Sequence, residues 1–462
     1  MDRAAASDAF PAVARAYLDA HPETEAVELF FTDLNCVARG KLLPVDALEK
    51  IGAGAVRMPV SSLATTLLGN DVSAPGIAID IGDPDGVFVP EPASLSPLPG
   101  AERPTAQVLG SLTDPGGDTL AEIDARACLL RQKEALAARG LTAVAAVELE
   151  FYLLDRRRDA AGHPQPPCVP GTGERLSLDQ IYDLGILRAF EPVLAEMRAA
   201  AQASGAPADT LLAEYSAGQF ETNLSHVADP VRAADDAILL KRAVRGIAAK
   251  HGLDATFMAK PYGHRAGCGM HIHLSLLDET GENLFASGTP GAPNQALRHV
   301  LGGLITTIGE GMLICAPHLN SYRRFMPSSF APRAAAWGTD NRGSALRCPA
   351  TSGAAARVEN RLPGADANPY LVLALMIGGA LKGLDARCDP GEPVAAEARP
   401  DDGLPLPLTW EAALSAWERS SFVEQVFGGE LKRVYAAAKA QEQAAFLAEV
   451  SRAELDAGLR RV

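Results

Sequence analysis

Four segments of the chain place polar residues at every second position, and this pattern limits the fold more than any other feature. "TAVAAVELEFYLLD" (142–155) puts Glu148 and Glu150 on one face of a strand, with apolar residues between them. "GCGMHIHLSL" (267–276) does the same with His271 and His273. A strand of this kind buries one face and leaves the other to solvent or a cavity. The pattern therefore predicts a sheet with one face covered by helices.

The other two segments carry carboxylates and arginines at the same period. In "EYSAGQFETNLSH" (214–226), Glu214 precedes a small-residue turn and Glu221 follows it. In "ARVENRLPGADANPY" (356–370), Arg357, Glu359 and Arg361 occupy positions i, i+2 and i+4. Each pattern alone is typical of a solvated face or a surface ladder of opposite charges. Four such strands in one domain indicate instead that the polar faces share a cavity.

A shared cavity would contain five carboxylates and at least one imidazole. Such a cluster repels itself by roughly several kcal/mol at an effective dielectric near 20, so bound cations are expected to hold it together. Mostly oxygen ligands with one nitrogen suit Mg²⁺ or Mn²⁺ rather than a structural zinc. Arginines in "NSYRRFMP" and "TDNRGSALRCP" add positive charge. Divalent ions beside arginines indicate phosphoryl transfer.

The sequence lacks the motifs of several other enzyme classes. The sequence contains no GxxxxGK[ST] or GxGxxG loop, so a P-loop or Rossmann nucleotide site is not expected. It contains no GxSxG nucleophile motif either.

The gross composition indicates an enzyme of two domains. A chain of 462 residues exceeds one compact core. Pro and Gly are dense from 84 to 117, so we expect a small β domain at 1–115 and a large mixed α+β domain at 116–462. A net charge of −15 argues against nucleic acid as a partner. The start lacks a signal-peptide pattern, and the longest apolar run, 370–381, is too short to span a bilayer, so no membrane partner is expected. Seven cysteines without a CxxC pair fit a reducing cytoplasm.

Periodicity and turn residues predict the order of the elements. A short helix over 8–20 precedes a hairpin over 26–44 that turns at Asp33–Asn35, and strands are expected within 75–90 and at 105–112. Helices are expected over 119–140, closed by Gly140, and over 179–204, 230–251 and 295–315. The last 55 or so residues are expected to be helical.

Several segments together resemble the type I glutamine synthetase family. They are "VELEFYL", "EYSAGQFE", "KPYGHRAGCGMHIHLSL", "NSYRRFMP", "DNRGSALR" and "RVENRLPGADANPYL", in matching order over about 25–450, while "FFTDLNCVARGK" resembles the N-terminal β-grasp strand pair of that family. The resemblance implies an α+β fold. It would combine a small N-terminal β-grasp domain with a large C-terminal catalytic domain, in which helices pack on an antiparallel sheet.

The resemblance also implies roles for individual residues. One metal ion would be held by Glu150, Glu214 and Glu221, and a second by Glu148, His271 and Glu359. The nucleotide side would include His273, Ser275, Arg347 and Arg357. The glutamate carboxylates would be gripped by Arg324 and Arg361, beside the backbone of Gly267. Arg342 would stabilise the transferring phosphoryl group, and Arg342 and Glu359 would be the catalytic residues.

The implied reaction uses ATP and two or three Mg²⁺ or Mn²⁺ ions. ATP would phosphorylate the γ-carboxylate of L-glutamate, and an amine would then attack the γ-glutamyl phosphate. The family's sites form between the large domain of one subunit and the small domain of its neighbour, so a homo-dodecamer is implied.

Three departures from the family pattern concern the amine. Ammonia-using members carry "DGSS", a glutamate in the flap and an asparagine before the glycine of "GSGMH". The corresponding positions here are Pro59 or Val60, Phe330 and Ala266. A phenyl ring removes a negative charge and adds apolar surface, which suits an amine with an alkyl or aryl chain and can hold a cation. We therefore predict a γ-glutamyl amine ligase, with Phe330 in the amine pocket.

The substrate expected first is a polyamine such as putrescine or spermidine, in amine catabolism, and small alkylamines or an aromatic amine remain open. An ammonia-using glutamine synthetase is the enzyme alternative. A non-catalytic structural or nucleotide-sensing relative is the alternative of another class.

Overall fold

Two sheets organise the part of the chain that the computed structural model describes, which is residues 3–289, 291–327, 329–395 and 401–462. The first sheet has the order β2-β1-β6-β4-β3, with β5 paired to β6. It is antiparallel except for the parallel pair β1–β6. Its strands are β1 (Ala26–Thr32), β2 (Ala38–Pro44), β3 (Arg57–Pro59), β4 (Asp85–Pro90), β5 (Ser96–Pro97) and β6 (Thr105–Leu112).

The second, larger sheet has the order β13-β14-β15-β11-β7-β9-β8, with β10 paired to β7. It is antiparallel except for the parallel pair β13–β14. Its strands are β7 (Thr142–Asp155), β8 (Ala208–Ala213), β9 (Gln219–Leu224), β10 (Leu253–Thr256), β11 (Met270–Leu277), β13 (Trp337–Thr339), β14 (Leu346–Ala350) and β15 (Arg357–Asn360). A further small pair joins β12 (Ala334–Ala335) to β16 (Leu404–Pro405).

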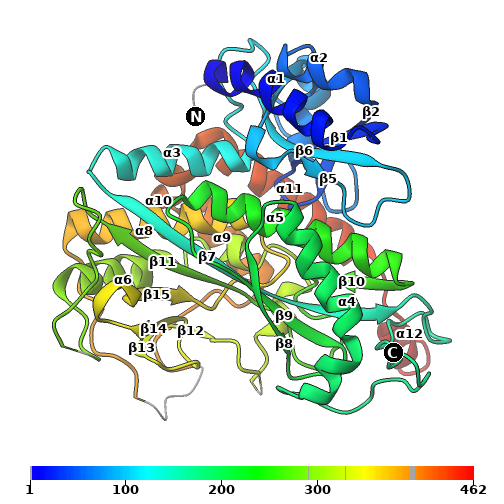
Figure 1. Ribbon diagram of the computed structural model, residues 1–462. Helices are drawn as coiled ribbons and strands as arrows, with labels where there is room; N and C mark the ends of the chain where they lie inside the picture. The colour runs from blue at the N-terminus through cyan, green and yellow to red at the C-terminus, as the bar shows by residue number, and fades with distance from the viewer. Residues whose placement is uncertain (1–2, 290, 328, 396–400) are drawn as a thin grey trace.

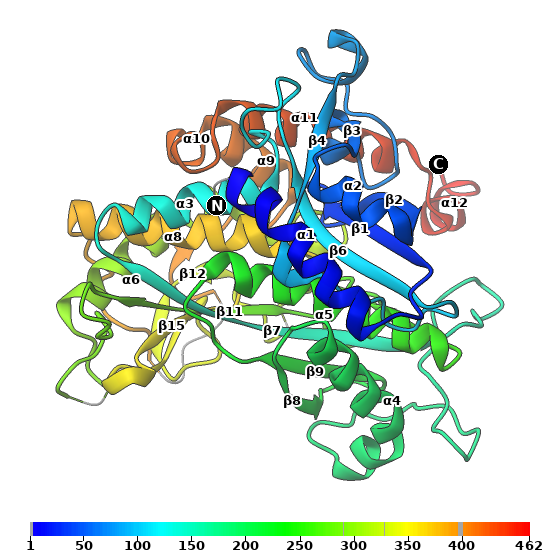
Figure 2. The ribbon, with the colours of Figure 1, turned by 45° about the horizontal axis from the view of Figure 1, so that its top comes forward.

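A layer of helices separates the two sheets (Figure 1). In both views α5 lies between the small sheet and β7, and α3 and α8 lie beside each other at the left of the picture (Figure 2). The helices are α1 (Arg3–Ala20), α2 (Leu48–Gly52), α3 (Ala125–Ala137), α4 (Leu184–Ala203), α5 (Pro230–Lys250), α6 (Gln295–Thr307), α7 (Met312–Cys315), α8 (Pro369–Ala386), α9 (Trp410–Arg419), α10 (Ser421–Phe427), α11 (Gly429–Ala448) and α12 (Arg452–Gly458). The alternation in β7 follows from this layer, because Val147, Leu149 and Phe151 are at most 1% exposed.

Helix α8 is the central helix of the core. Asn368 caps its first turn, and its backbone passes so close to α6 that a Cβ at Gly383 would lie 2.2 Å from the carbonyl oxygen of His299. By length and composition alone, α8 could cross a membrane, but 78% of its most apolar window is buried inside the fold. Such burial is typical of the core helix of a globular domain.

The strand register brings the polar faces of the large sheet together. His271 and Asn223 lie opposite Glu148 on its two sides, and Glu221 lies opposite Glu150. On the other side of β11, Glu359 lies opposite His273. Directly opposed residues in antiparallel strands have Cβ atoms about 4.5–5.5 Å apart. The sheet therefore forces these side chains into mutual contact on the face that the helices leave uncovered.

The α+β class is confirmed, and so is the hairpin of β1 and β2. The expectation of strands within 75–90 is confirmed for β4 and wrong for the part before it, because Ala78–Ile81 forms a 3₁₀ helix between the positive-φ residues Gly76 and Gly82. The helix expected from 119 begins at Ala125, after its cap Asp124. The helix expected over 295–315 divides into α6 and α7. The expected domain boundary at 115/116 falls between β6 and α3 and stays a prediction.

Candidate active site

The predicted metal ligands form three overlapping groups on the uncovered face of the large sheet. Within each group, one ligand atom per residue lies within 4.8 Å of the others. The groups are Glu150, Glu214 and Glu221; Glu148, Glu221 and His271; and Glu148, His273 and Glu359. All six predicted ligands are thus brought together, and His273 joins them.

The first group consists of carboxylates alone. Glu150 accepts hydrogen bonds from the backbone N–H of Gly269 (2.8 Å) and from Gln219 Nε2 (3.3 Å). Burial, followed by the charge of Glu214, raises the pKa of Glu150 to about 7. Burial, followed by the charges of Glu150 and Glu148, raises the pKa of Glu221 to about 9. A divalent cation would offset the charge repulsion among these buried carboxylates, so this donor set fits Mg²⁺ or Mn²⁺.

The second and third groups place Glu148 between two imidazoles. His271 Nδ1 lies 3.3 Å from Glu148 Oε2, and His273 Nε2 lies 2.9 Å from Glu148 Oε1 but off the line of a hydrogen bond. Burial opposes ionisation of Glu148, but the two adjacent imidazoles outweigh it and hold the Glu148 pKa below its usual range. Burial lowers the pKa of His271 to about 4. His271 is therefore neutral at pH 7, which is the form that binds metal.

The grouping of the two histidines differs from the expected one. We expected His271 to share a metal with Glu148 and Glu359, and His273 to lie on the nucleotide side. The structure groups His273 with Glu148 and Glu359, and it groups His271 with Glu148 and Glu221. The register explains the difference, because Glu359 lies directly opposite His273. Which imidazole serves the metal and which serves the nucleotide stays a prediction.

A row of arginines borders the acidic groups. Glu359 is fully buried and accepts hydrogen bonds from Arg347 Nη1 (2.7 Å) and from Arg361 Nη1. Arg357 Nε donates to His273 Nδ1 at 3.2 Å. Arg361 also donates through Nε to the carbonyl oxygen of Arg342, whose side chain is exposed. These cations beside carboxylates could bind a polyphosphate and its metal ions.

Ser275 hydrogen-bonds to the backbone next to Arg357. It donates to the carbonyl oxygen of Ala356 at 2.8 Å, which ties β11 to the start of β15.

Arg324 and Gly267 lie together on the side predicted for glutamate. Arg324 is 6% exposed and donates to the carbonyl oxygens of Leu362 (2.7 Å) and Arg361 (3.1 Å). A Cβ at Gly267 would lie 2.8 Å from Arg324 Cγ and 2.7 Å from the carbonyl oxygen of Ala259. Glycine is therefore required for packing against Arg324, in addition to the close substrate approach that the resemblance implies.

The three positions that depart from the family pattern lie in different surroundings. Phe330 is 75% exposed, and its ring centroid lies 6.1 Å from that of Tyr215. The carbonyl oxygen of Ala266 accepts a hydrogen bond from the hydroxyl of Tyr152 at 2.8 Å. Pro59 ends β3, and Val60 begins the following 3₁₀ turn, both beside the small sheet.

Three residues of the site were missed in the sequence. Gln219 donates to both Glu150 and the carbonyl oxygen of Gly267, and it occurs two residues before Glu221, so the period of two could have identified it. Asp340 pairs with Arg347 from a turn that carries no periodic signal. Tyr215 meets Phe330 across more than a hundred residues of sequence, which no local pattern predicts.

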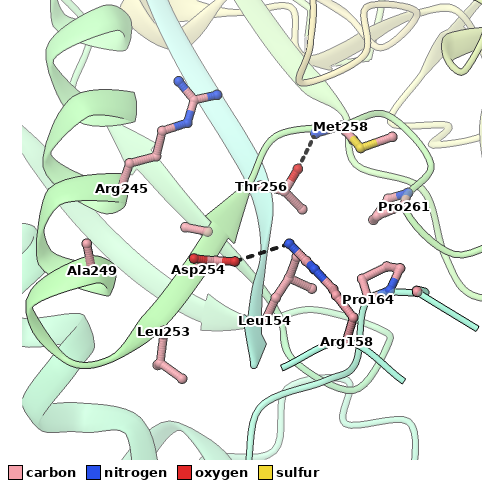
Figure 3. Close-up of a pocket in the computed structure, with 12 residues that line it drawn as sticks. Leu154, Arg158, Pro164, Arg245, Ala249, Leu253, Asp254, Thr256, Met258 and Pro261 are labelled. Carbon is pink, nitrogen blue, oxygen red and sulfur yellow. Dashed lines mark hydrogen bonds and ion pairs between the residues drawn. The ribbon is translucent and has the colours of Figure 1, made fainter. Parts of the chain in front are cut away.

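A separate cavity of about 510 Å³ lies beside β10 and α5, and none of the predicted site residues lines it. Figure 3 shows Arg158 directed toward Asp254. It also shows Arg245 on the neighbouring helix α5. This cavity is therefore distinct from the acidic groups.

The fold and the site together define a class of enzyme in which clustered carboxylates, able to hold metal ions, lie beside arginines on one face of a mostly antiparallel sheet. Comparison with known proteins narrows this class. The family "Glutamine synthetase, catalytic domain" matches residues 122–457. The chain therefore belongs to the glutamine synthetase family, and it is a ligase.

Three relatives and one solved structure illustrate the similarity. Gamma-glutamylputrescine synthetase of Escherichia coli is 41% identical over 97% of this chain and 94% of that protein. Glutamate–isopropylamine ligase of a Pseudomonas species is 31% identical, covering 93% of each chain. Gamma-glutamylethanolamide synthetase of Streptomyces coelicolor is 35% identical over 83% of this chain and 81% of that protein. A GmaS–ADP complex superposes with a TM-score of 0.82 at 26% identity, covering 96% and 99% of the two chains.

Proposed function

We propose that the chain joins the γ-carboxylate of L-glutamate to a primary amine at the expense of ATP. The observation that carries this proposal is the meeting of five carboxylates, two imidazoles and a row of arginines on one face of the large sheet. The relatives named for γ-glutamyl amides support ATP-dependent ligation of glutamate to an amine.

The residues of the acidic groups would hold two or three divalent cations. Glu150, Glu214 and Glu221 would hold one ion, and Glu148, Glu359 and an imidazole would hold a second. When bound, such ions supply positive charge that neutralises the phosphate oxygens of ATP during transfer. Arg347 and Arg357 would bind the nucleotide phosphates, and Arg342 would stabilise the transferring group.

Glutamate would be oriented by Arg324 and Arg361. The buried Arg324 is fixed by two backbone carbonyls, and its remaining hydrogen-bonding capacity can serve a substrate carboxylate. Arg361 is already bound to Glu359, so binding of the substrate there would be coupled to the acidic groups.

The proposed reaction has two balanced steps. First, a γ-carboxylate oxygen of glutamate attacks the γ-phosphorus of ATP, and the bond to the bridging oxygen breaks to release ADP. Second, the amine nitrogen attacks the γ-carbonyl carbon of the γ-glutamyl phosphate. Phosphate leaves with the oxygen that joined this carbon to phosphorus, and the nitrogen loses a proton. The first step is needed because a free carboxylate is a poor electrophile, and a protonated amine must lose a proton before it can attack.

A polyamine such as putrescine or spermidine is the amine we propose. By the resemblance to the family, Phe330 stands at the flap position where ammonia-using members carry a glutamate, and the 41% identical relative is named for putrescine. A ring in place of a carboxylate removes the charge that selects ammonium and offers apolar surface to a carbon chain. Action in the cytoplasm, as a homo-dodecamer with sites between subunits, remains part of the proposal.

The test is phosphate release from ATP and glutamate across a panel of amines. The panel comprises ammonium, methylamine, ethanolamine, isopropylamine, putrescine, cadaverine, spermidine and spermine. We expect the highest kcat/KM with a di- or polyamine, and no phosphate release in Glu150→Ala, which lacks a metal ligand. A preference for ammonium over every alkylamine would favour the ordinary glutamine synthetase instead. Absence of turnover with all amines would favour a non-catalytic relative.

A further inference from the structure

We propose that Tyr215 is a second specificity residue, and that its ring and the ring of Phe330 form an aromatic pair that contacts the carbon chain and the distal ammonium group of a diamine. This inference rests on the proposed function, because it assigns the substrate side of the same site. The observation behind it is a contact between two exposed rings, at a centroid distance of 6.1 Å and an interplanar angle of 54°.

The backbone of Tyr215 is fixed beside the acidic groups. Tyr215 directly follows Glu214, and its N–H donates to Glu214 Oε2 at 3.0 Å. Its carbonyl oxygen accepts a hydrogen bond from the N–H of Gln180 at 2.8 Å. The ring of Tyr215 therefore stands one residue away from a predicted metal ligand, on the segment that leads into β9.

Phe330 reaches the same place from the glutamate side. Its neighbour Ser329 donates from Oγ to the carbonyl oxygen of Arg324 at 2.7 Å. Arg333 Nη1 donates to the carbonyl oxygen of Phe325, which closes the turn on its other side. The ring contact thus joins the segment that carries Glu214 to the turn that follows Arg324.

The exposure of the two rings leaves surface for a ligand. Tyr215 is 38% exposed and Phe330 is 75% exposed, although both are large apolar side chains. The exposed parts of the two rings offer apolar surface against which a chain of methylene groups can lie. A terminal ammonium group held over a ring face gains a factor of about two to thirty in affinity.

The pair predicts a specific order of substrates. A diamine can use both ring contacts and the cation contact, butylamine can use the ring contacts alone, and hydroxylamine is too small to use either. Removal of one ring should therefore lower kcat/KM most for putrescine, less for butylamine and least for hydroxylamine. The loss should arise mainly from a higher KM.

The experiment compares Tyr215→Ala, Phe330→Ala and the double variant with these three nucleophiles, using the complete chain with ATP, glutamate and Mg²⁺. We expect each single variant to lower the ratio of kcat/KM for putrescine to that for hydroxylamine by about tenfold, and Tyr215→Phe to restore most of the ratio. We expect the double variant to lose less than the product of the single effects, because the rings are in contact. Tyr182→Ala is the matched control, since Tyr182 is 60% exposed and its N–H bonds to Ala213 on the neighbouring segment.

Several outcomes would overturn the inference while the proposed function stands. One is a wild-type enzyme that ligates putrescine together with a Tyr215→Ala variant of unchanged ratio. Another is an equal loss with all three nucleophiles, which would indicate general damage to the site. A Tyr182→Ala variant with the same selective loss, or a Tyr215→Ala variant of lower oligomeric mass, would also contradict it. If the wild-type enzyme forms no amide with any amine, the proposed function itself fails.

Discussion

Glu221 should destabilise the metal-free fold, so Glu221→Gln is expected to stabilise it while weakening metal binding. Glu221 is 6% exposed, and burial together with the charges of Glu150 and Glu148 raises its pKa from 4.5 to about 9. A carboxyl group whose pKa is higher in the folded chain than in the unfolded chain costs stability as the pH rises between these two values. The folded chain therefore begins to lose stability near pH 4.5 and continues to lose it up to about pH 9.

The size of the effect at pH 7 follows from the same two values. From pH 4.5 to pH 7 the unfolded carboxyl group ionises while the folded one stays protonated, and each pH unit costs about 1.4 kcal/mol. The total is about 3 kcal/mol, which glutamine avoids because it does not ionise. For a chain of 462 residues, the unfolding entropy is about 1 kcal/mol per kelvin, so the Tm should rise by about 3 °C.

The assay is thermal unfolding of wild type and Glu221→Gln in EDTA at pH 5, 7 and 8.5, and then with Mg²⁺ or Mn²⁺. The difference in Tm should be small at pH 5 and should grow toward pH 8.5. Added metal should raise the Tm of the wild type much more than that of the variant, which has lost a ligand. Glu174→Gln, at an exposed position outside the site, is the control and should show neither effect. A variant that gains no stability at pH 8.5, or that responds to metal like the wild type, would refute the reasoning.

Three further changes should act on other parts of the molecule. Phe330→Glu should move the ratio of kcat/KM for ammonium to that for putrescine toward ammonium by about fivefold, because an exposed carboxylate attracts a small cation by about 1 kcal/mol. An unchanged amine profile would count against the flap assignment. Gly267→Ala should raise the KM for glutamate, since its Cβ would lie 2.8 Å from Arg324 Cγ, and steady-state kinetics with glutamate varied will check this. Glu442→Gln should lower the free energy of unfolding by about 3–5 kcal/mol in urea at pH 7, because Lys439 would be left buried without its 3.0 Å partner. The Lys439 ammonium holds the pKa of Glu442 at about 2 against burial. The greater free energy of unfolding of the wild type should therefore be lost as the pH falls from about 4.5 toward 2. An equal acid sensitivity of the variant would contradict the assignment.

The strand faces could be predicted from the sequence because side chains alternate with a period of two. Glu148 and Glu150 share a face wherever β7 lies, and the same holds for His271 and His273 on β11. The need for a bound cation was predictable as well, because carboxylates that share a cavity repel one another. The resemblance then assigned roles that periodicity alone could not.

The contacts between strands could not be predicted, because register depends on pairing between distant segments. His273 lies opposite Glu359 only because β11 and β15 pair in the register that the structure shows, and this pairing changed the expected grouping of the histidines. The packing of Gly267 against Arg324 and the contact of Tyr215 with Phe330 also join segments far apart in the chain. Turn chemistry caused the error at 75–90, where Gly76 and Gly82 override an alternating pattern.

The central claim is that the site activates the γ-carboxylate of glutamate by phosphorylation. Its most direct test follows oxygen-18 from glutamate labelled in both γ-carboxylate oxygens, with ATP, Mg²⁺ and putrescine, and measures the phosphate released by mass spectrometry. Each phosphate should carry one labelled oxygen, and the amide product should retain the other. Phosphate without label, released while the amide forms, would contradict the account.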